Sequence, residues 1–176
     1  MEISINSDML KISLQLYRMH TQLFNNAIVD IRADDAKQRL FERTNHIIWM
    51  VGNLVNNRFW LANALGVSDK DPFGSLFDEA KALDESYDYP SLEQLKSSWH
   101  HISPLLFHKL CDMTTAELLS AYDMGMGDMA FMESNYLSAI AMSIDREEYL
   151  IGQLGLMRKA LGYPAMDYQL DATIPY

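Results

Sequence analysis

The chain has 176 residues, of which 49% are hydrophobic and 22% charged, and its formal net charge is -10. This length and composition predict one globular domain over residues 1–176. The acidic balance disfavours contact with phosphate backbones, so we expect no nucleic-acid partner. The chain has no run of eighteen apolar residues, and its N-terminal stretch lacks the basic start and apolar run of a signal peptide. We therefore expect no membrane partner and a cytoplasmic location.

Two long helices are predicted in the first third of the chain. Apolar residues recur at three- and four-residue spacing over 8–31, with Ser7 as a candidate N-cap. A second helix is predicted over 37–65, ending before Gly66, which suits a helix C-terminus. Its polar face includes His46 and Asn53, which are seven residues apart and so share one side of the helix.

An acidic stretch with few apolar residues in register separates the second helix from the third. It covers residues 67–90 and predicts at most a short helix, over 75–83. A connection of this length inside a compact domain is uncommon and indicates a crossover between helices.

The second half of the chain predicts two further long helices. Ser91 and Gln94 form a capping-box pattern that opens the third helix, whose apolar stripe continues to residue 110, and we expect Pro104 to kink this helix or to begin a new turn. A second capping box, over residues 114–117, opens a short helix that we expect to continue to about residue 122. The last helix is predicted over 128–161, before Gly162. The predicted fold class is therefore all-α, a four-helix bundle with a long crossover between the second and third helices.

Several short motifs, in this order, resemble those of the DinB/YfiT-like family. They are the segment 45–54 (NHIIWMVGNL), the segment 89–91 (YPS), the segment 152–154 (GQL) and the Leu-Gly pair at 161–162. The resemblance covers most of the chain. It implies a DinB-like four-helix bundle, and it implies a homodimer.

The same resemblance implies where a metal ion would lie. Family members often bind zinc or nickel through one histidine of the second helix and a pair of histidines, four residues apart, on the last helix. The corresponding positions here are Asn53, Arg146 and Leu150. Asparagine is a poor zinc or nickel ligand, leucine cannot bind a metal, and arginine brings a fixed positive charge. We therefore expect no metal cofactor at this position.

A polar pocket is the expected replacement for the metal site. The candidate ligand-binding residues are Asn53, Arg146, Leu150, Gln153 and His46. If Arg146 points into the bundle it needs an anion, which is either a protein carboxylate in an ion pair or a small anionic ligand. The first functional hypothesis is thus a DinB-like protein with a degenerate metal site that binds a small molecule or a partner, rather than an active metalloenzyme.

Two alternatives remain open. One is a metal-dependent thiol transferase or hydrolase with a relocated metal site, built from His46 and helix-four carboxylates such as Asp145, Glu147 or Glu148. The other is a structural protein without a ligand. The catalytic residues, if there are any, are unknown from the sequence.

Overall fold

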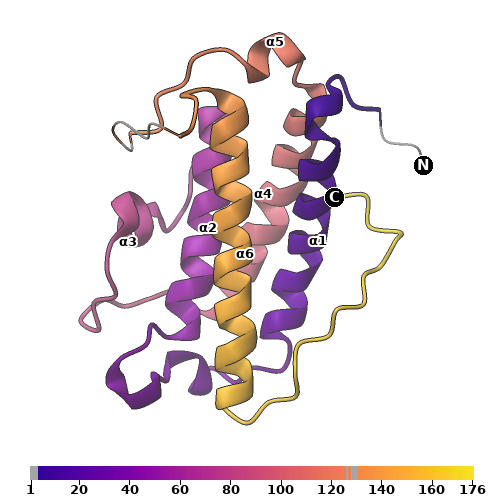
Figure 1. Cartoon of the computed structure of the whole chain (residues 1–176). Coiled ribbons are helices and arrows are strands. Elements are labelled where there is room, and N and C mark those ends of the chain that lie inside the picture. Colours follow the sequence, from indigo (N-terminus) through magenta and orange to yellow (C-terminus); the bar gives the residue numbers. More distant parts are fainter. Residues whose placement is uncertain (1–3, 126, 128–130) are drawn as a thin grey trace.

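The computed structural model describes residues 4–125, 127 and 131–176, and the regular elements in these residues are helices (Figure 1). One isolated bridge, between Ala121 and Asn135, is the only strand-like pairing in this part of the chain. The four long helices are α1 (Lys11–Ile28), α2 (Ile47–Ala64), α4 (Leu92–Asp112) and α6 (Tyr136–Ala160). The short elements are α3 (Gly74–Phe77), α5 (Thr115–Leu118) and the 3-10 turns Asp8–Leu10, Asp35–Lys37, Leu40–Glu42 and Asp78–Ala80.

The four long helices pack side by side, and each contacts two of the others closely. In Figure 1, α1 and α6 run in one direction while α2 and α4 run in the opposite direction. The closest packing joins α2 to both α4 and α6, and α1 to α6. The order along the chain is therefore down, up, up, down, which a crossover between α2 and α4 makes possible.

The predicted crossover is confirmed. The segment between α2 and α4 carries α3 and returns along the outside of the bundle to the start of α4 (Figure 1). Phe77, at the end of α3, fixes this segment to α2 by lying over Gly52. A Cβ atom at Gly52 would fall only 2.0 Å from the Phe77 ring, so α2 requires a glycine there. The short helix predicted over 75–83 is confirmed only in part, as α3 and the 3-10 turn that follows it.

The second helix begins ten residues later than predicted. Residues 37–46 form 3-10 turns and loop, and Phe41 and Glu42 have positive φ angles that a right-handed helix excludes. The helix starts at Ile47 because His46 caps it: the backbone N–H of Trp49 donates to His46 Nδ1 at 2.9 Å. At the other end, Gly66 adopts the expected left-handed conformation with a φ of 90°.

The last helix also begins later than predicted. Residues 128–130 of the predicted range lie outside the described residues, and residues 131–135 are described and not helical. Asn135 is the N-cap, since its Oδ1 accepts from the backbone N–H of Ser138 at 2.9 Å. This capping requirement sets the start of the helix, although the apolar pattern continues upstream.

The first helix is shorter at both ends than predicted. A 3-10 turn precedes it, and α1 itself ends at Ile28. Ser7 does not cap it with its side chain, and its hydroxyl instead lies 2.8 Å from that of Thr115, which ties the N-terminal segment to α5.

The two capping boxes are confirmed. They begin α4 at Ser91 and α5 at Thr114, and α5 ends at Leu118 rather than near residue 122. The α4 helix continues through Pro104 to Asp112. No described helix is both long and apolar enough to cross a lipid bilayer.

Candidate functional site

The predicted ligand residues Asn53 and Arg146 meet at the contact between α2 and α6. Arg146 Nη2 donates to Asn53 Oδ1 at 2.9 Å, and Asn53 Nδ2 donates to the carbonyl of Trp49 at 3.0 Å. Asn53 is buried, while Arg146 is only partly exposed to solvent. Within the described part of the chain, no carboxylate oxygen lies within 4.0 Å of the Arg146 guanidinium. Of the two anions considered for Arg146, a protein carboxylate is therefore not observed among the described residues, and the observed partner is a neutral amide.

The antiparallel register of α2 and α6 gives the positions of the other predicted site residues on α6, Leu150 and Gln153. One turn above the Asn53–Arg146 contact, Asn57 Nδ2 donates to the Ser143 hydroxyl at 2.8 Å and to the Ser143 carbonyl at 3.0 Å. In the same register, Leu150 and then Gln153 follow Arg146 toward the C-terminal end of α6. Leu150 is buried and Gln153 is partly exposed.

We call this strip the α2–α6 seam and define it by Trp49, Asn53, Arg146, Leu150 and Gln153. Trp49 lies one turn before Asn53 on α2, and its indole Nε1 is buried without a hydrogen-bond partner among the described residues. A buried donor without an acceptor costs free energy, of the order of 1–3 kcal/mol. The seam therefore holds unused hydrogen-bond donors, on Trp49 and on the guanidinium of Arg146.

His46 lies at the N-terminal end of α2, where its side chain has a structural role. Its ring packs edge-on against Tyr89, with ring centroids 5.1 Å apart, while its Nδ1 caps the helix. Burial lowers the pKa of His46. A neutral imidazole is what the cap requires, because Nδ1 must keep a lone pair to accept the Trp49 N–H.

The seam does not fit the zinc or nickel ion that the family resemblance implies. The oxygen of Asn53 accepts from a permanently charged guanidinium, and Leu150 supplies only hydrocarbon. A divalent cation would have to displace Arg146 and then bind beside its charge. The seam residues therefore do not support metal-dependent chemistry at this position.

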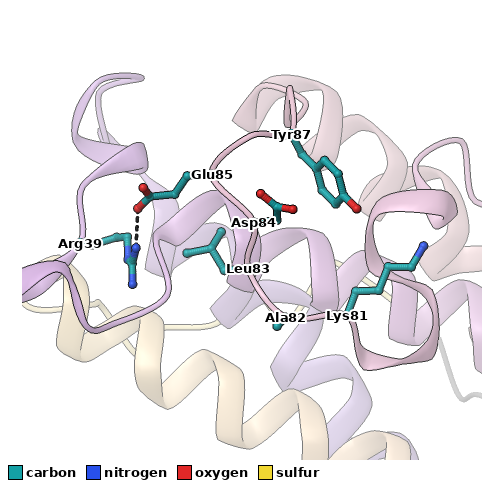
Figure 2. A pocket seen from close by; sticks show the side chains of 7 residues that line it. All are labelled: Arg39, Lys81, Ala82, Leu83, Asp84, Glu85 and Tyr87. Atoms are coloured by element: carbon teal, nitrogen blue, oxygen red, sulfur yellow. Dashed lines mark hydrogen bonds and ion pairs between the residues drawn. The ribbon is translucent and has the colours of Figure 1, made fainter.

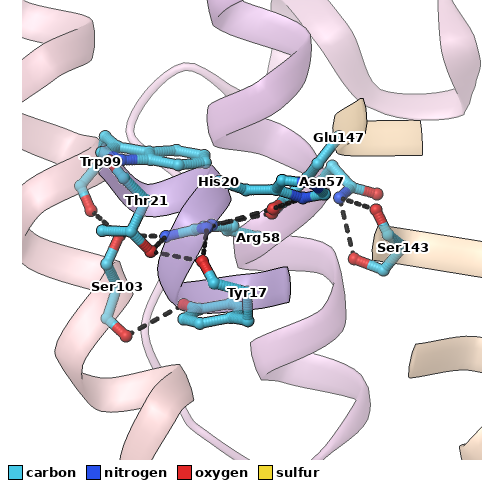
Figure 3. A network of polar contacts seen from close by, with 9 residues as sticks. All are labelled: Tyr17, His20, Thr21, Asn57, Arg58, Trp99, Ser103, Ser143 and Glu147. Atoms are coloured by element: carbon cyan, nitrogen blue, oxygen red, sulfur yellow. Dashed lines mark hydrogen bonds and ion pairs between the residues drawn. The ribbon is translucent and has the colours of Figure 1, made fainter. Parts of the chain in front are cut away.

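A second cluster of polar side chains, not expected from the sequence, lies in the core of the bundle (Figure 3). Its centre is Arg58 of α2, whose side chain is fully buried. Its Nε and Nη2 bind the two carboxylate oxygens of Glu147, at 2.7 and 3.1 Å. Its Nη1 donates to the hydroxyls of Thr21 and Ser103, at 2.9 and 2.6 Å, and Nη2 also donates to the carbonyl of Tyr17, at 3.3 Å. These five bonds satisfy all five N–H donors of the guanidinium.

Aromatic rings cover both faces of the same guanidinium. Its central carbon lies 3.5 Å from the centroid of the Trp99 ring and 4.0 Å from that of Tyr17. Phe24 stacks on Trp99, with centroids 4.2 Å apart and an interplanar angle of 9°. Cation–π contacts are strongest where water is excluded, so the rings compensate part of the cost of burying the charge.

Glu147 supplies the counter-charge and is 1% exposed. Burial works against its charged form, but the charge of Arg58 and the hydrogen bonds to it outweigh burial, so the pKa of Glu147 is lowered. His20 Nδ1 lies 3.3 Å from Glu147 Oε2, close enough for an ion-pair contact although not aligned as a hydrogen bond. The cluster joins α1, α2, α4 and α6, and we call it the core arginine network.

The structure does not bring together the residues of the relocated metal site. Glu147 contacts Arg58, which follows His46 by twelve residues, or about 18 Å along a helix axis. Asp145 and Glu148 are exposed. Across the described ranges, no three histidine, cysteine, aspartate or glutamate side chains gather as a set of metal ligands.

The sequence does contain a signal for the core arginine network. Arg58 occupies a position four residues after Leu54 and three before Leu61, in the apolar stripe of α2. Glu147 likewise follows Ile140 and Ile144 on the core-facing side of α6. One cation and one anion, each at a position where the pattern requires an apolar residue, indicate a buried ion pair.

A surface hollow beside the crossover offers no comparable chemistry (Figure 2). Its cavity volume is about 540 Å³, and Figure 2 shows Arg39 directed at Glu85 across it. These two side chains form an ion pair, and Arg39 Nε also donates to the carbonyl of Thr44 at 2.7 Å. Two of the four charged side chains that line the hollow are thus engaged with each other.

Comparison with known proteins identified no relative of this chain. No family model, no curated protein and no solved structure matches the chain.

Proposed function

We propose that the protein is a DinB-like bundle that binds a small anionic molecule at the α2–α6 seam, in place of the metal ion that the family resemblance implies. The observation that carries this proposal is the Arg146 guanidinium, which is partly buried and bound to the Asn53 amide with no carboxylate within 4.0 Å among the described residues. Its other N–H groups are available for a carboxylate or phosphate oxygen.

The neighbouring groups support the same assignment. The Trp49 indole supplies a further buried donor, and the partly exposed amide of Gln153 lies beyond Arg146 on α6. A permanent positive charge with N–H donors left over favours an anion over a neutral ligand. The down-up-up-down helix order, with its long crossover, supports the DinB-like assignment. The homodimer that the resemblance implies stays a prediction, which sedimentation equilibrium tests.

A thermal-shift screen of small carboxylates and phosphates tests the proposal. We expect at least one anion to raise the melting temperature of the native protein and to lose this effect in Arg146→Gln. Arg146→Lys keeps the charge but loses the planar fork, so we expect it to bind more weakly than the native protein. Arg43→Gln removes an exposed arginine of the loop before α2, outside the seam, and serves as the matched control. The proposal fails if every anion that stabilises the native protein stabilises Arg146→Gln equally.

A further inference from the structure

A second pocket lies on the opposite side of α2 from the core. Its walls come from the outer face of α2, the crossover around α3 and the segment that follows α5, and its cavity volume is about 560 Å³. This volume falls within the usual range for small-molecule sites, about 300–1,000 Å³. None of the seam residues lines it.

Two aromatic rings form a corner in this pocket. Trp60 of α2 and Tyr122 have ring centroids 6.4 Å apart and planes inclined at 62°, so one ring edge faces the other. Tyr122 is held in place by stacking on Tyr136, with centroids 4.6 Å apart. Trp60 is 37% exposed, which is unusual for tryptophan and leaves part of its face open to the pocket. A partly exposed indole face attracts a cation.

A pair of carboxylates lies on the same pocket wall. Asn56 Nδ2 donates to Asp71 Oδ2 at 3.0 Å and to Asp78 Oδ1 at 2.9 Å, which holds the two negative groups near one another. Asp78 also lies close against Gly74, where a Cβ atom would approach its oxygens to 3.1 Å. Burial and, less strongly, the like charge of Asp78 act to raise the pKa of Asp71.

One basic residue also lines the pocket. Lys70 is exposed, and no carboxylate oxygen lies within 4.0 Å of its ammonium group among the described residues. The local balance of two carboxylates against one ammonium therefore remains negative, in a protein whose formal net charge is -10.

We propose that this pocket binds a small organic cation that carries an ammonium group on an apolar body. The apolar body lies against Trp60 and Tyr122, and the ammonium group faces Asp71 and Asp78. The proposal is independent of the anion site at the seam, because the two sites lie on different faces of α2 and share no residue.

Calorimetry with three probes of the same shape tests the charge preference. The probes are 2-phenylethylammonium, the neutral 2-phenylethanol and the anionic 3-phenylpropionate, each titrated into the native protein at neutral pH. We expect the ammonium probe to bind at least about tenfold more tightly than the alcohol, since cation–π and carboxylate contacts together exceed 1.4 kcal/mol. We expect no measurable binding of the anionic probe, 3-phenylpropionate.

Single substitutions then locate the site. We expect Trp60→Ala to weaken binding of the ammonium probe about tenfold, and Asp78→Asn to weaken it several-fold. Lys70→Gln is the decisive variant, since removing a positive charge strengthens the binding of a cation and weakens that of an anion. Tyr149→Ala and Asp145→Asn change an exposed aromatic and an exposed carboxylate on α6 and serve as matched controls.

Three outcomes would overturn the proposal. The first is equal affinity for the three probes, and the second is weaker binding of the ammonium probe to Lys70→Gln. The third is absence of heat from the ammonium probe up to about 10 mM, which corresponds to a free energy weaker than about 3 kcal/mol. Circular dichroism of each variant checks the fold, and the exposed position of Lys70 makes its variant informative even if Trp60→Ala is unstable.

Discussion

Two arginines on facing helices show how differently the bundle treats the same guanidinium. Arg58 is fully buried, and its five N–H donors, both faces of its planar guanidinium and its charge are all matched by protein groups. Arg146 is partly exposed and has one protein partner, the amide of Asn53, among the described residues. A group with every donor occupied stabilises a structure but has no capacity left for a ligand, whereas the incompletely paired arginine keeps that capacity.

The largest expected effect is the loss of the buried cation. We expect Arg58→Met to lower the free energy of unfolding by about 3–5 kcal/mol, because it leaves the Glu147 carboxylate buried without a counter-charge. Urea unfolding followed by circular dichroism measures the change. An effect as small as that of Arg146→Met would show that the two arginines are equivalent.

Replacing both members of the ion pair should recover most of this loss. We expect the double variant Arg58→Met, Glu147→Leu to lie within about 2 kcal/mol of the native protein, since neither charge is then left alone in the core. A double-mutant cycle with the two single variants gives the coupling free energy. Additive losses would mean that the carboxylate and the guanidinium act separately.

Acid should weaken the native protein more than this double variant. The pKa of Glu147 is lowered from its ordinary value of 4.5, so its stabilisation is complete above that pH. It is lost as the pH falls through the lowered value in the folded protein, because the unfolded chain then binds the proton more readily. Melting temperatures between pH 7 and pH 3 should therefore fall more steeply in the native protein, and parallel curves would contradict the assignment.

The smallest stability effect is expected at the seam. Arg146→Met leaves the buried oxygen of Asn53 without its donor, and we expect a loss of about 1–2 kcal/mol, less than that of the core variant. Urea unfolding under the conditions used for Arg58→Met measures it. A loss comparable to that of the core variant would indicate that Arg146 is structural and would weaken the case for a ligand there.

Apolar periodicity predicted the four long helices but could not predict where two of them begin. Phe41 and Glu42 interrupt the second helix through positive φ angles, and an imidazole rather than a hydroxyl or carboxylate caps it at His46. The cap of α6 at Asn135 was readable, since asparagine is a favoured N-cap, but the apolar residues before it extended the predicted helix.

The site was predicted in part, because spacing identifies a shared face but not a partner. Asn53 and Arg146 were expected on facing helices and do meet. Their contact with each other was not expected, since it depends on the relative register of α2 and α6. Arg58 was missed although its place in the apolar stripe of α2 is readable, because the groups that compensate its burial, Trp99, Tyr17 and Glu147, are all distant in sequence.

The core arginine network also has a consequence for synthesis of the chain on the ribosome. Arg58 emerges well before Glu147, so a nascent chain that contains α1, α2 and α4 has a core arginine without its carboxylate. Closing the bundle around that charge would be costly until α6 has been made. Contacts between residues 89 positions apart also form slowly, because the intervening chain must first be ordered. The bundle therefore completes its fold only after the last long helix, α6, has been synthesised.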